Sequence, residues 1–299
     1  MAASLPERLE LLVLTGGEPF LRSDFVDVVR IFQEENRPFW TNISTNGLLP
    51  DRIVDAVSKM LPTLQGELSV QVSVDGLRET HDRIRGASGS FDKAVTTIRR
   101  LKGLAEDCPA LRVVALTVIC DQNYEEIEEV AGLLHDELGI DHGFELVRDN
   151  KVGLWGVRPE VREASSPRAL SLPPMDRLDE IHQRFRRINA REGYPHALFV
   201  TKTAYQIRML KKKKKIFDCV AGGNLIGVVY ADGSVAHCEF TRPFANLADF
   251  DFDFPRLWAS PEAESRRKDI AHCYCVHTCY LTKNMQSSLR ANLGLITGL

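Results

Sequence analysis

The sequence lacks a long hydrophobic segment, a strong net charge and any cysteine before Cys108. No apolar run approaches the roughly 18 residues that a membrane span needs, and no basic start precedes an apolar stretch as in a secretory signal. A net charge of −3 excludes a general electrostatic attraction to nucleic acid or to an anionic membrane. In the absence of export signals we expect a cytoplasmic protein without a membrane partner.

Cysteine is distributed unevenly along the 299 residues. Two cysteines, Cys108 and Cys120, are isolated and read as ordinary loop or buried residues. The other five lie in the last third of the chain: Cys219, Cys238, Cys273, Cys275 and Cys279. In an intracellular protein such a group is more typical of metal binding than of disulfides, so this part of the chain predicts a metal site.

The first half of the chain alternates predicted strands with predicted helices. Strands are predicted at 11–15, 39–45, 68–74, 111–120 and 143–147. Helices are predicted at 24–34, 50–60, 90–104 and 123–138, the last with Asn123 at its N-cap. Such a rhythm indicates parallel βα units, either an open doubly wound sheet or a (β/α) barrel, and both bind ligands at the carboxyl ends of their strands.

Three of these strand ends carry small residues together with a carboxylate or an amide. The segments are Gly16-Gly17-Glu18-Pro19, Ser44-Thr45-Asn46-Gly47 and Ser73-Val74-Asp75-Gly76. Because the carboxyl ends of parallel strands share one edge of a sheet, these segments predict a single polar site.

The second half has a different character. Residues 149–174 are rich in proline and indicate a linker, followed by predicted helices at 175–191 and 203–215. Strands at 225–230 and 234–238 flank Ala231-Asp232-Gly233, which is typical of a hairpin turn. The block Lys211–Lys215 is interpreted as a solvated helix end, the alternative being a site for an acidic or phosphate-bearing partner, with nucleic acid disfavoured by the net charge.

These motifs resemble the radical SAM enzymes. The segment "LTGGEPFLR" at 14–22 is similar to the second strand end of that family, and "STNG" at 44–47 to the third. The fourth-strand signature is similar to "SVDG" at 73–76 followed by "HDRIRG" at 81–86. The resemblance implies an α/β fold with a partial (β/α)6 TIM-like barrel that lacks its first strand.

The same resemblance implies roles for individual residues toward S-adenosylmethionine. The Gly16-Gly17 backbone and Glu18 would hold its amino group, Ser73 and Asp75 would lie near its ribose, and Arg85 is a candidate partner for its carboxylate. The complete set of implied cofactor-binding residues is Gly16, Gly17, Glu18, Pro19, Ser44, Asn46, Ser73, Asp75 and Arg85. For His81 and Asp82 we expect a bracing role at a helix entry or a loop rather than acid–base chemistry.

The C-terminal cysteines, in the order Cys, hairpin, Cys, close group, resemble the SPASM/Twitch extension of this family, a small α+β module that holds an auxiliary [4Fe–4S] cluster. The favoured ligands are Cys219, Cys238, Cys275 and Cys279, with Cys273 as the alternate. Spacing alone leaves structural zinc open. The adjacent His237, His272 and His277 are expected to be neighbours rather than ligands. The implied domains are the barrel at 1–150, linker and helices at 151–215 and the cluster module at 216–299.

One family element has no counterpart in the sequence, namely the C-x3-C-x2-C segment that binds the catalytic [4Fe–4S] cluster upstream of the GGEP motif. We therefore expect either an N-terminally truncated radical SAM enzyme, inactive as written, or a degenerate relative that cannot start a radical. The favoured reading is the truncated enzyme, which would generate a 5′-deoxyadenosyl radical to modify a peptide, protein or small molecule once the segment is restored. A reductant such as flavodoxin or ferredoxin would be its partner.

A third hypothesis belongs to a different class of protein. The working part would then be the C-terminal cluster alone, in a non-catalytic iron–sulfur binding or electron-transfer protein.

Overall fold

The computed structural model describes residues 1–148, 153–163, 170–191 and 197–288, which form two compact units. One unit is Ala2–Glu145, and the other is Leu146–Leu299 together with Met1. The predicted helices of segment 151–215 therefore belong to the second unit. Parts of the predicted linker and of the C-terminal module, at 149–152, 164–169, 192–196 and 289–299, lie outside the described residues. Among the described helices, none is both long and apolar enough to cross a membrane.

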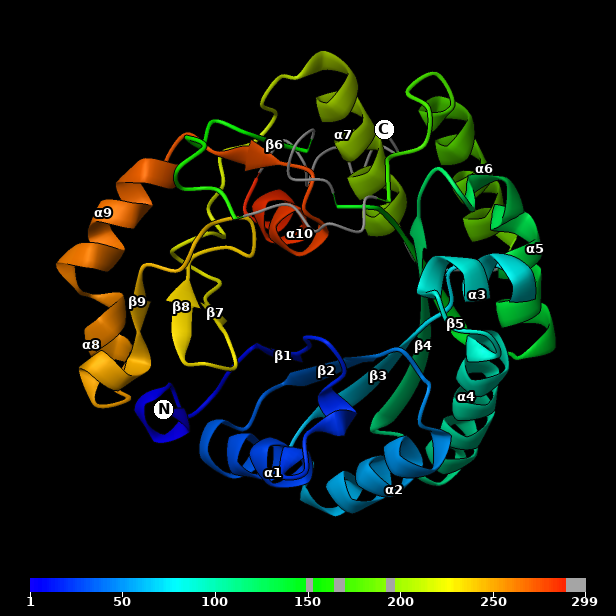
Figure 1. The fold of residues 1–299 in the computed structure, drawn as a ribbon, viewed down its shortest axis with the longest axis horizontal. Coiled ribbons are helices and arrows are strands. Elements are labelled where there is room, and N and C mark those ends of the chain that lie inside the picture. Colours follow the sequence, from blue (N-terminus) through cyan, green and yellow to red (C-terminus); the bar gives the residue numbers. More distant parts are fainter. Residues whose placement is uncertain (149–152, 164–169, 192–196, 289–299) are drawn as a thin grey trace. The chain divides into compact units, whose positions relative to one another are not determined.

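The first unit is built on a five-stranded sheet in sequential order (Figure 1). Its strands are β1 (Leu11–Leu14), β2 (Trp40–Thr45), β3 (Glu67–Ser73), β4 (Leu111–Ile119) and β5 (Asp141–Leu146). Pairing is parallel from β1 to β4, with Ile43 opposite both Leu14 and Val70, and Val70 opposite Val113. The predicted alternation of strands and helices is thus confirmed.

The helices of this unit follow the strands. They are α1 (Phe25–Asn36), α2 (Pro50–Met60), α3 (Arg78–Arg85), α4 (Ser90–Asp107) and α5 (Ile127–Ala131). Helix α3 was not expected, because its polar sequence RETHDRIR carries almost no apolar periodicity. The helix predicted at 123–138 is instead divided into a 3-10 turn at Tyr124–Glu126, then α5, then a π-helical segment at Gly132–Glu137.

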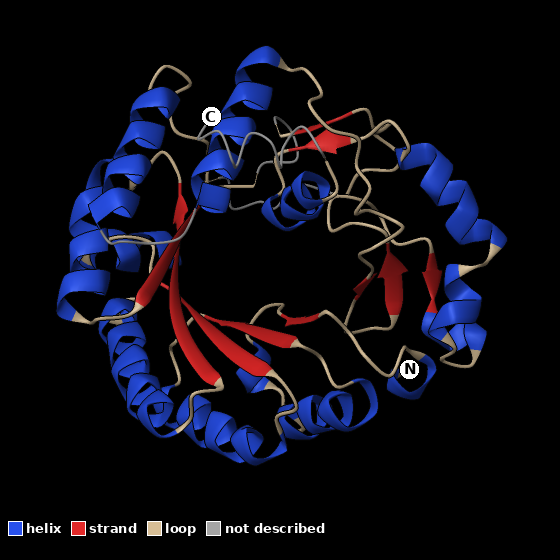
Figure 2. Ribbon diagram, turned by 180° about the vertical axis from the view of Figure 1, so that it is seen from behind, coloured by secondary structure: helices blue, strands red, loops and turns tan. Residues whose placement is uncertain are grey.

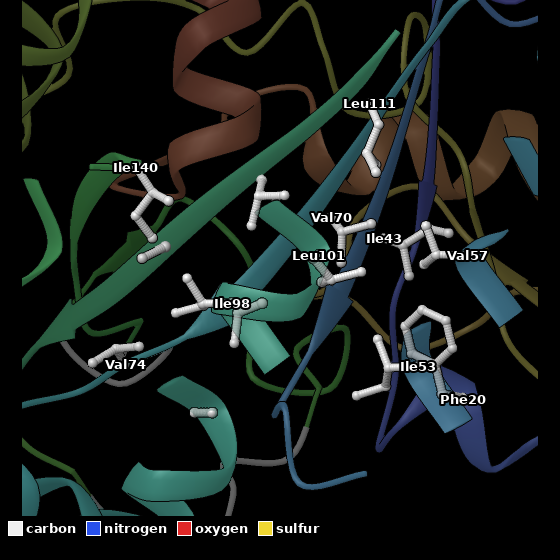
Figure 3. Packing of buried hydrophobic residues seen from close by; sticks show 14 of the residues in the cluster. Phe20, Ile43, Ile53, Val57, Val70, Val74, Ile98, Leu101, Leu111 and Ile140 are labelled. Carbon is white, nitrogen blue, oxygen red and sulfur yellow. The ribbon is translucent and has the colours of Figure 1, made fainter. Parts of the chain in front are cut away.

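The sheet buries one face and leaves the other partly exposed. Along β2 and β3 the residues alternate, so that Thr41, Ile43 and Thr45, and then Leu68, Val70 and Val72, are buried. These side chains pack against α1, α2 and α4 in one core cluster, where Ile43 and Val70 meet Ile53, Val57, Ile98 and Leu101 (Figure 3). On β2 and β3 the opposite face is polar, with Asn42, Ser44, Ser69, Gln71 and Ser73 half-buried. The hydrophobic core therefore lies wholly between the sheet and its helices.

The second unit has shorter strands (Figure 2). Its strands form an antiparallel pair, β6 (Leu154–Trp155) with β10 (Tyr274–Cys275), and an antiparallel three-stranded sheet of β7 (Val228–Val229), β8 (Ser234–Ala236) and β9 (Ala245–Asn246). Its helices are α6 (Leu178–Arg191), α7 (Ala197–Lys212), α8 (Phe254–Trp258), α9 (Pro261–Ile270) and α10 (Thr278–Gln286). The hairpin expected around Asp232-Gly233 is present as β7–β8.

Asp82 joins α3 to the start of α4. Its carboxylate accepts hydrogen bonds from the backbone N–H groups of Gly89 (2.6 Å) and Phe91 (2.9 Å) and from the Ser90 hydroxyl (2.7 Å). The bond from Phe91, followed by that from Ser90, lowers the pKa of Asp82 to about 2. The expected bracing role of Asp82 is confirmed.

This cap makes a testable contribution to acid stability. Because the folded-state pKa of about 2 lies below the ordinary 3.8, the Asp82 carboxylate stabilises the fold above about pH 4, and this is lost as the pH falls toward 2. We expect Asp82→Asn to lower the thermal midpoint at pH 7 and to match the wild type at pH 2. For the control, Asp107→Asn at the exposed end of α4, the thermal midpoint should change with pH between 7 and 2 as it does in the wild type. If the thermal midpoint of Asp82→Asn also followed that of the wild type over this pH range, the stabilising role of the Asp82 carboxylate would be contradicted.

Candidate functional site

Glu18 links the carboxyl ends of the first two strands. One of its carboxylate oxygens accepts hydrogen bonds from the Thr45 hydroxyl (2.9 Å) and the Phe20 backbone N–H (3.3 Å). The other accepts from the backbone N–H of Asn46 at 2.8 Å. Two of the predicted motifs, GGEP and STNG, are therefore joined through this side chain at one edge of the sheet.

The glycine turn before Glu18 leaves room beside that carboxylate. Gly16 has φ +144°, a conformation that disfavours any side chain, and a Cβ placed on Gly16 or Gly17 would find no atom within 4 Å. A carboxylate offers about four acceptor positions, and the protein occupies three on Glu18. An ammonium group could therefore approach the open turn and still find an acceptor.

The serines at the ends of β2 and β3 lie on the polar face of the sheet. Ser44 is half-buried and donates a hydrogen bond to the side-chain carbonyl of Gln71 at 3.2 Å. Ser73 ends β3 and is also half-buried. Asn46 turns its side-chain oxygen to the backbone N–H of Leu48 at 2.9 Å. The predicted residues of these strands are thus half-buried near the carboxyl edge of the sheet.

Asp75 is buried, and its carboxylate and backbone carbonyl bind other residues of the chain. One carboxylate oxygen accepts from the backbone N–H of Val118 at 3.0 Å, and the other forms an ion pair with Arg85 at 2.5 Å. Its backbone carbonyl accepts from the Asn123 side-chain amide at 2.9 Å. The structure thus brings Asp75 and Arg85 together as partners of each other. Arg85 retains a buried Nε without a partner among the described residues.

Asn123 differs from its expected role. It occupies an N-cap position but makes no capping bond through its side chain. Its amide group instead donates to the carbonyls of Asp75 and Val118, both at 2.9 Å, while its oxygen accepts from the backbone of Cys120 at 2.8 Å. The prediction of a simple helix cap was wrong, because three backbone groups at the ends of β3 and β4 take up the side chain.

The turn that follows Asp75 is held from the next strand end. Glu126 accepts hydrogen bonds from the Leu77 backbone N–H (2.8 Å) and from the Thr80 hydroxyl. Gly76 has φ +151°, and a Cβ there would lie 2.7 Å from a Thr80 methyl carbon and 3.0 Å from a Glu126 oxygen. Only glycine fits this position.

The cysteines of the second unit divide into a buried group and an exposed residue. Cys238, Cys273 and Cys275 are buried in one cluster with Cys219 packed against it. The neighbouring Cys219 and Cys275 thiols, together with burial, raise the pKa of Cys273. Cys279, the fourth ligand favoured from the sequence, is exposed. The structure therefore favours the alternate, Cys273, beside Cys219, Cys238 and Cys275, and the choice stays a prediction.

The surroundings of the buried group act differently on its individual thiols. Backbone N–H groups of Gly222 and Phe240 point to the sulfurs of Cys219 and Cys238, each at 3.4 Å. The hydrogen bond from Cys273 is the main cause of a Cys219 pKa lowered to about 6, whereas burial raises the pKa of Cys238. No group of three or more His, Cys, Asp or Glu side chains among the described residues is placed to hold a single metal ion. A four-iron cluster differs from such a site because each iron takes its own thiolate.

The histidines beside these cysteines have protein or solvent partners. His237 is buried and contacts the carbonyl of Ala263 at 2.9 Å, and His272 is exposed. His277 is buried and lies 3.3 Å from the Glu239 carboxylate, which also binds Arg148 at 2.5 Å. Burial would raise the pKa of Glu239, but His277 and Arg148 outweigh it and lower that pKa to about 2. This acidic–basic group was not found from the sequence, since its members are far apart along the chain.

The lysine block ends a helix, as interpreted from the sequence. Helix α7 ends at Lys212, and Lys211 pairs with Asp179 at 2.6 Å. Lys215 pairs with Asp218. The pairing with neighbouring carboxylates gives this block no special ligand geometry.

The thiols of the first unit do not fit a second iron–sulfur cluster. Cys120 is fully buried at the end of β4, and its backbone and sulfur are engaged by Asn123 and Gln122. Cys108 lies after the last residue of α4, at the opposite end of β4. Two thiols at opposite ends of a strand cannot supply the cysteine set that such a cluster requires.

Comparison with known sequences finds matches to the first unit. Residues 1–134 match the radical SAM superfamily. The Fe-coproporphyrin III synthase of Methanosarcina barkeri is 35% identical over 127 residues, which are 42% of this chain and 29% of that protein. The sporulation killing factor maturation protein SkfB of Bacillus subtilis is 34% identical over 122 residues, 40% of this chain and 26% of SkfB. The chain thus matches less than a third of the length of these relatives.

A likeness of fold extends further along the chain. The solved structure of anSMEcpe with bound AdoMet and the Kp18Cys peptide has a TM-score of 0.59 to this chain at 16% identity. The superposition covers 89% of this chain and 73% of that one. At this identity the likeness establishes a shared fold.

Proposed function

From the match of residues 1–134 to the radical SAM superfamily, we propose that the chain binds S-adenosylmethionine at the carboxyl edge of β1–β3, as part of a radical SAM enzyme. The observation that carries the proposal is the joint arrangement of an open glycine turn and the Glu18 carboxylate. A cation next to a partly buried carboxylate is favourable, because charge-assisted hydrogen bonds are about twice as strong as neutral ones.

Each predicted residue then has a defined task. Glu18 and the carbonyls of the Gly16-Gly17 turn bind the ammonium group, and Arg85 donates its Nε–H to the carboxylate while it remains paired with Asp75. Ser73 lies beside the ribose, and Ser44 and Asn46 line the same edge. Asp75 does not contact the ligand but stabilises the β3–α3 turn through its bonds to Val118, Arg85 and Asn123. When bound, S-adenosylmethionine supplies the 5′-deoxyadenosyl group for radical chemistry, and the residues named here orient it.

The second unit is proposed to hold an auxiliary [4Fe–4S] cluster of the SPASM/Twitch kind. Four thiols, several of them buried, and two N–H groups directed at sulfur fit the donor set of such a cluster. The proposed ligands are Cys219, Cys238, Cys275 and, because it lies in the buried group, Cys273. The cluster would supply an electron relay or an anchor for substrate. For the catalytic cluster the chain's own thiols do not fit, so no step is assigned to it.

The substrate class follows from the relatives only in outline. Their names describe one protein that acts in peptide maturation and another that acts in porphyrin synthesis. We propose a peptide, protein or small molecule as substrate, flavodoxin or ferredoxin as reductant, and a cytoplasmic location.

A second candidate is an iron–sulfur or electron-transfer protein without radical chemistry. The observation that favours it is that the buried thiol group belongs to the second unit, whereas the first unit has only two separate cysteines. It predicts iron binding without S-adenosylmethionine binding.

The two candidates are separated by one titration. The chain is reconstituted anaerobically with iron and sulfide, and S-adenosylmethionine is added in a calorimeter. We expect saturable binding of about one molecule per chain. Iron uptake without any S-adenosylmethionine binding would reject the first candidate and support the second.

A further inference from the structure

The β3–α3 turn depends on a histidine that lies on the following helix. His81 is completely buried, and its Nδ1 accepts a hydrogen bond from the backbone N–H of Asp75 at 3.0 Å. An Nδ1 that accepts must be unprotonated, so the ring carries its proton on Nε2. That Nε2 is buried and without a hydrogen-bond partner among the described residues. Burial also lowers the pKa of His81, which keeps the ring neutral.

Every polar atom of Asp75 is used within the protein. Its N–H is taken by His81, its carbonyl by Asn123, and its two carboxylate oxygens by Val118 and Arg85. With only 3% of the residue exposed, Asp75 presents almost no surface to a ligand. The contacts available to a ligand at this strand end therefore come from Ser73 and from the turn around Asp75, whose position the surrounding bonds determine.

His81 and Arg85 act from the same side of α3. Residues four apart lie one turn above another on a helix, and both of these side chains reach Asp75. Glu126 fixes the next part of the turn through Leu77. The turn is thereby held by a histidine, an arginine and a glutamate, and His81 is the member that supplies a neutral acceptor to its backbone.

We infer that His81 is a positioning residue for the proposed ligand site, which sets the β3–α3 turn through the Asp75 backbone and does not itself touch the ligand. This inference rests on the proposed binding of S-adenosylmethionine and deepens it. Loss of the Nδ1 acceptor would leave a buried N–H unpaired, and the turn would shift to satisfy it.

A matched pair of variants isolates the acceptor. Asparagine places an oxygen near the position of Nδ1, whereas leucine has almost the same shape as asparagine and no acceptor. We expect His81→Leu to weaken S-adenosylmethionine binding about tenfold and His81→Asn to stay within about threefold of the wild type. Hydrogen exchange at the Asp75–Leu77 amides should be faster in His81→Leu and close to wild type in His81→Asn. A merely space-filling role would not produce this rescue by asparagine.

The exchange comparison keeps the test independent of the ligand. If the wild type fails to bind S-adenosylmethionine, the proposed function is rejected, and the amide exchange of the two variants still decides the role of His81. Should the leucine variant not fold, ¹⁵N spectra of the histidine-labelled wild type give the answer. A non-protonated Nδ1 on the His81 ring is expected. A ring protonated on Nδ1, or equal exchange and binding in both variants and the wild type, would overturn the inference.

Discussion

Reconstituted anaerobically with iron and sulfide, the wild-type chain is expected to bind about four irons and Cys238→Ser to lose most of them. Cys238 is buried, receives an N–H hydrogen bond from Phe240 and lies beside the other thiols of the group. Replacement by serine exchanges a soft thiolate for a hard, poorly ionised hydroxyl at a site that iron–sulfur clusters bind through sulfur. Iron and sulfide analysis, together with the visible absorption of the cluster, measures the loss.

The two candidates for the fourth ligand position, Cys273 and Cys279, provide a matched comparison. Cys273→Ser should lose iron because Cys273 is buried in the same cluster as Cys219 and Cys275, whereas Cys279→Ser should retain it because Cys279 is exposed. The reverse result would restore the ligand set favoured from sequence spacing. Zinc without sulfide in the wild type would reject the cluster altogether.

Glu18→Gln is expected to weaken S-adenosylmethionine binding about tenfold to a hundredfold. Hydrogen bonds to a charged group contribute about 1.5–3 kcal/mol, and the amide removes the charge that pairs with the ligand ammonium. Calorimetry on the reconstituted chain measures the dissociation constant.

The control separates charge from local structure. Thr45→Val removes the hydroxyl that donates to Glu18 at 2.9 Å. The variant keeps the shape of the side chain at position 45 and leaves the Glu18 carboxylate in place. We expect this variant to bind within about threefold of the wild type. If Thr45→Val loses as much affinity as Glu18→Gln, the Glu18 effect is one of strand-end structure rather than of ligand charge. Equal binding by Glu18→Gln and the wild type would remove Glu18 from the site.

The fold of the first unit could be predicted because its signals are local. Helix α2 begins and ends at the predicted residues, since Pro50 suits a first helical turn and the apolar spacing continues to Met60. The strands follow the apolar runs to within a residue or two. Helix α3 was not predicted because its contacts with Glu126 and Asp75 are polar, and polar contacts leave no apolar period in the sequence.

The sequence predicted which motifs would lie together, but not what each residue of a motif contacts. The sequence placed Glu18 and Asn46 at one site, and they are hydrogen-bonded to each other. It assigned Asp75 to the ligand, whereas the structure gives its carboxylate to Val118 and Arg85. A buried carboxylate and an exposed one look alike in a sequence, because the partners of Asp75 are up to 48 residues away in the chain.

The cysteines illustrate the same difficulty. The spacing of Cys275 and Cys279 suggested a ligand pair, but Cys275 lies in the short strand β10 and Cys279 in helix α10. The pairing of β10 with β6 is formed by two-residue strands, for which the sequence gives no periodicity. Cys273 directly precedes β10 and is buried, which spacing alone could not predict.

The polar face of the sheet has a consequence for how this protein can change. Since β2 and β3 alternate strictly, Asn42, Ser44, Ser69, Gln71 and Ser73 point away from the cluster formed by Ile43, Val70 and their helices. Substitutions on that face leave the apolar packing untouched, so they can accumulate at little cost to folding. Recognition can therefore diversify among descendants of one scaffold, with new ligand preferences arising by single exchanges along two strands while the architecture is inherited unchanged.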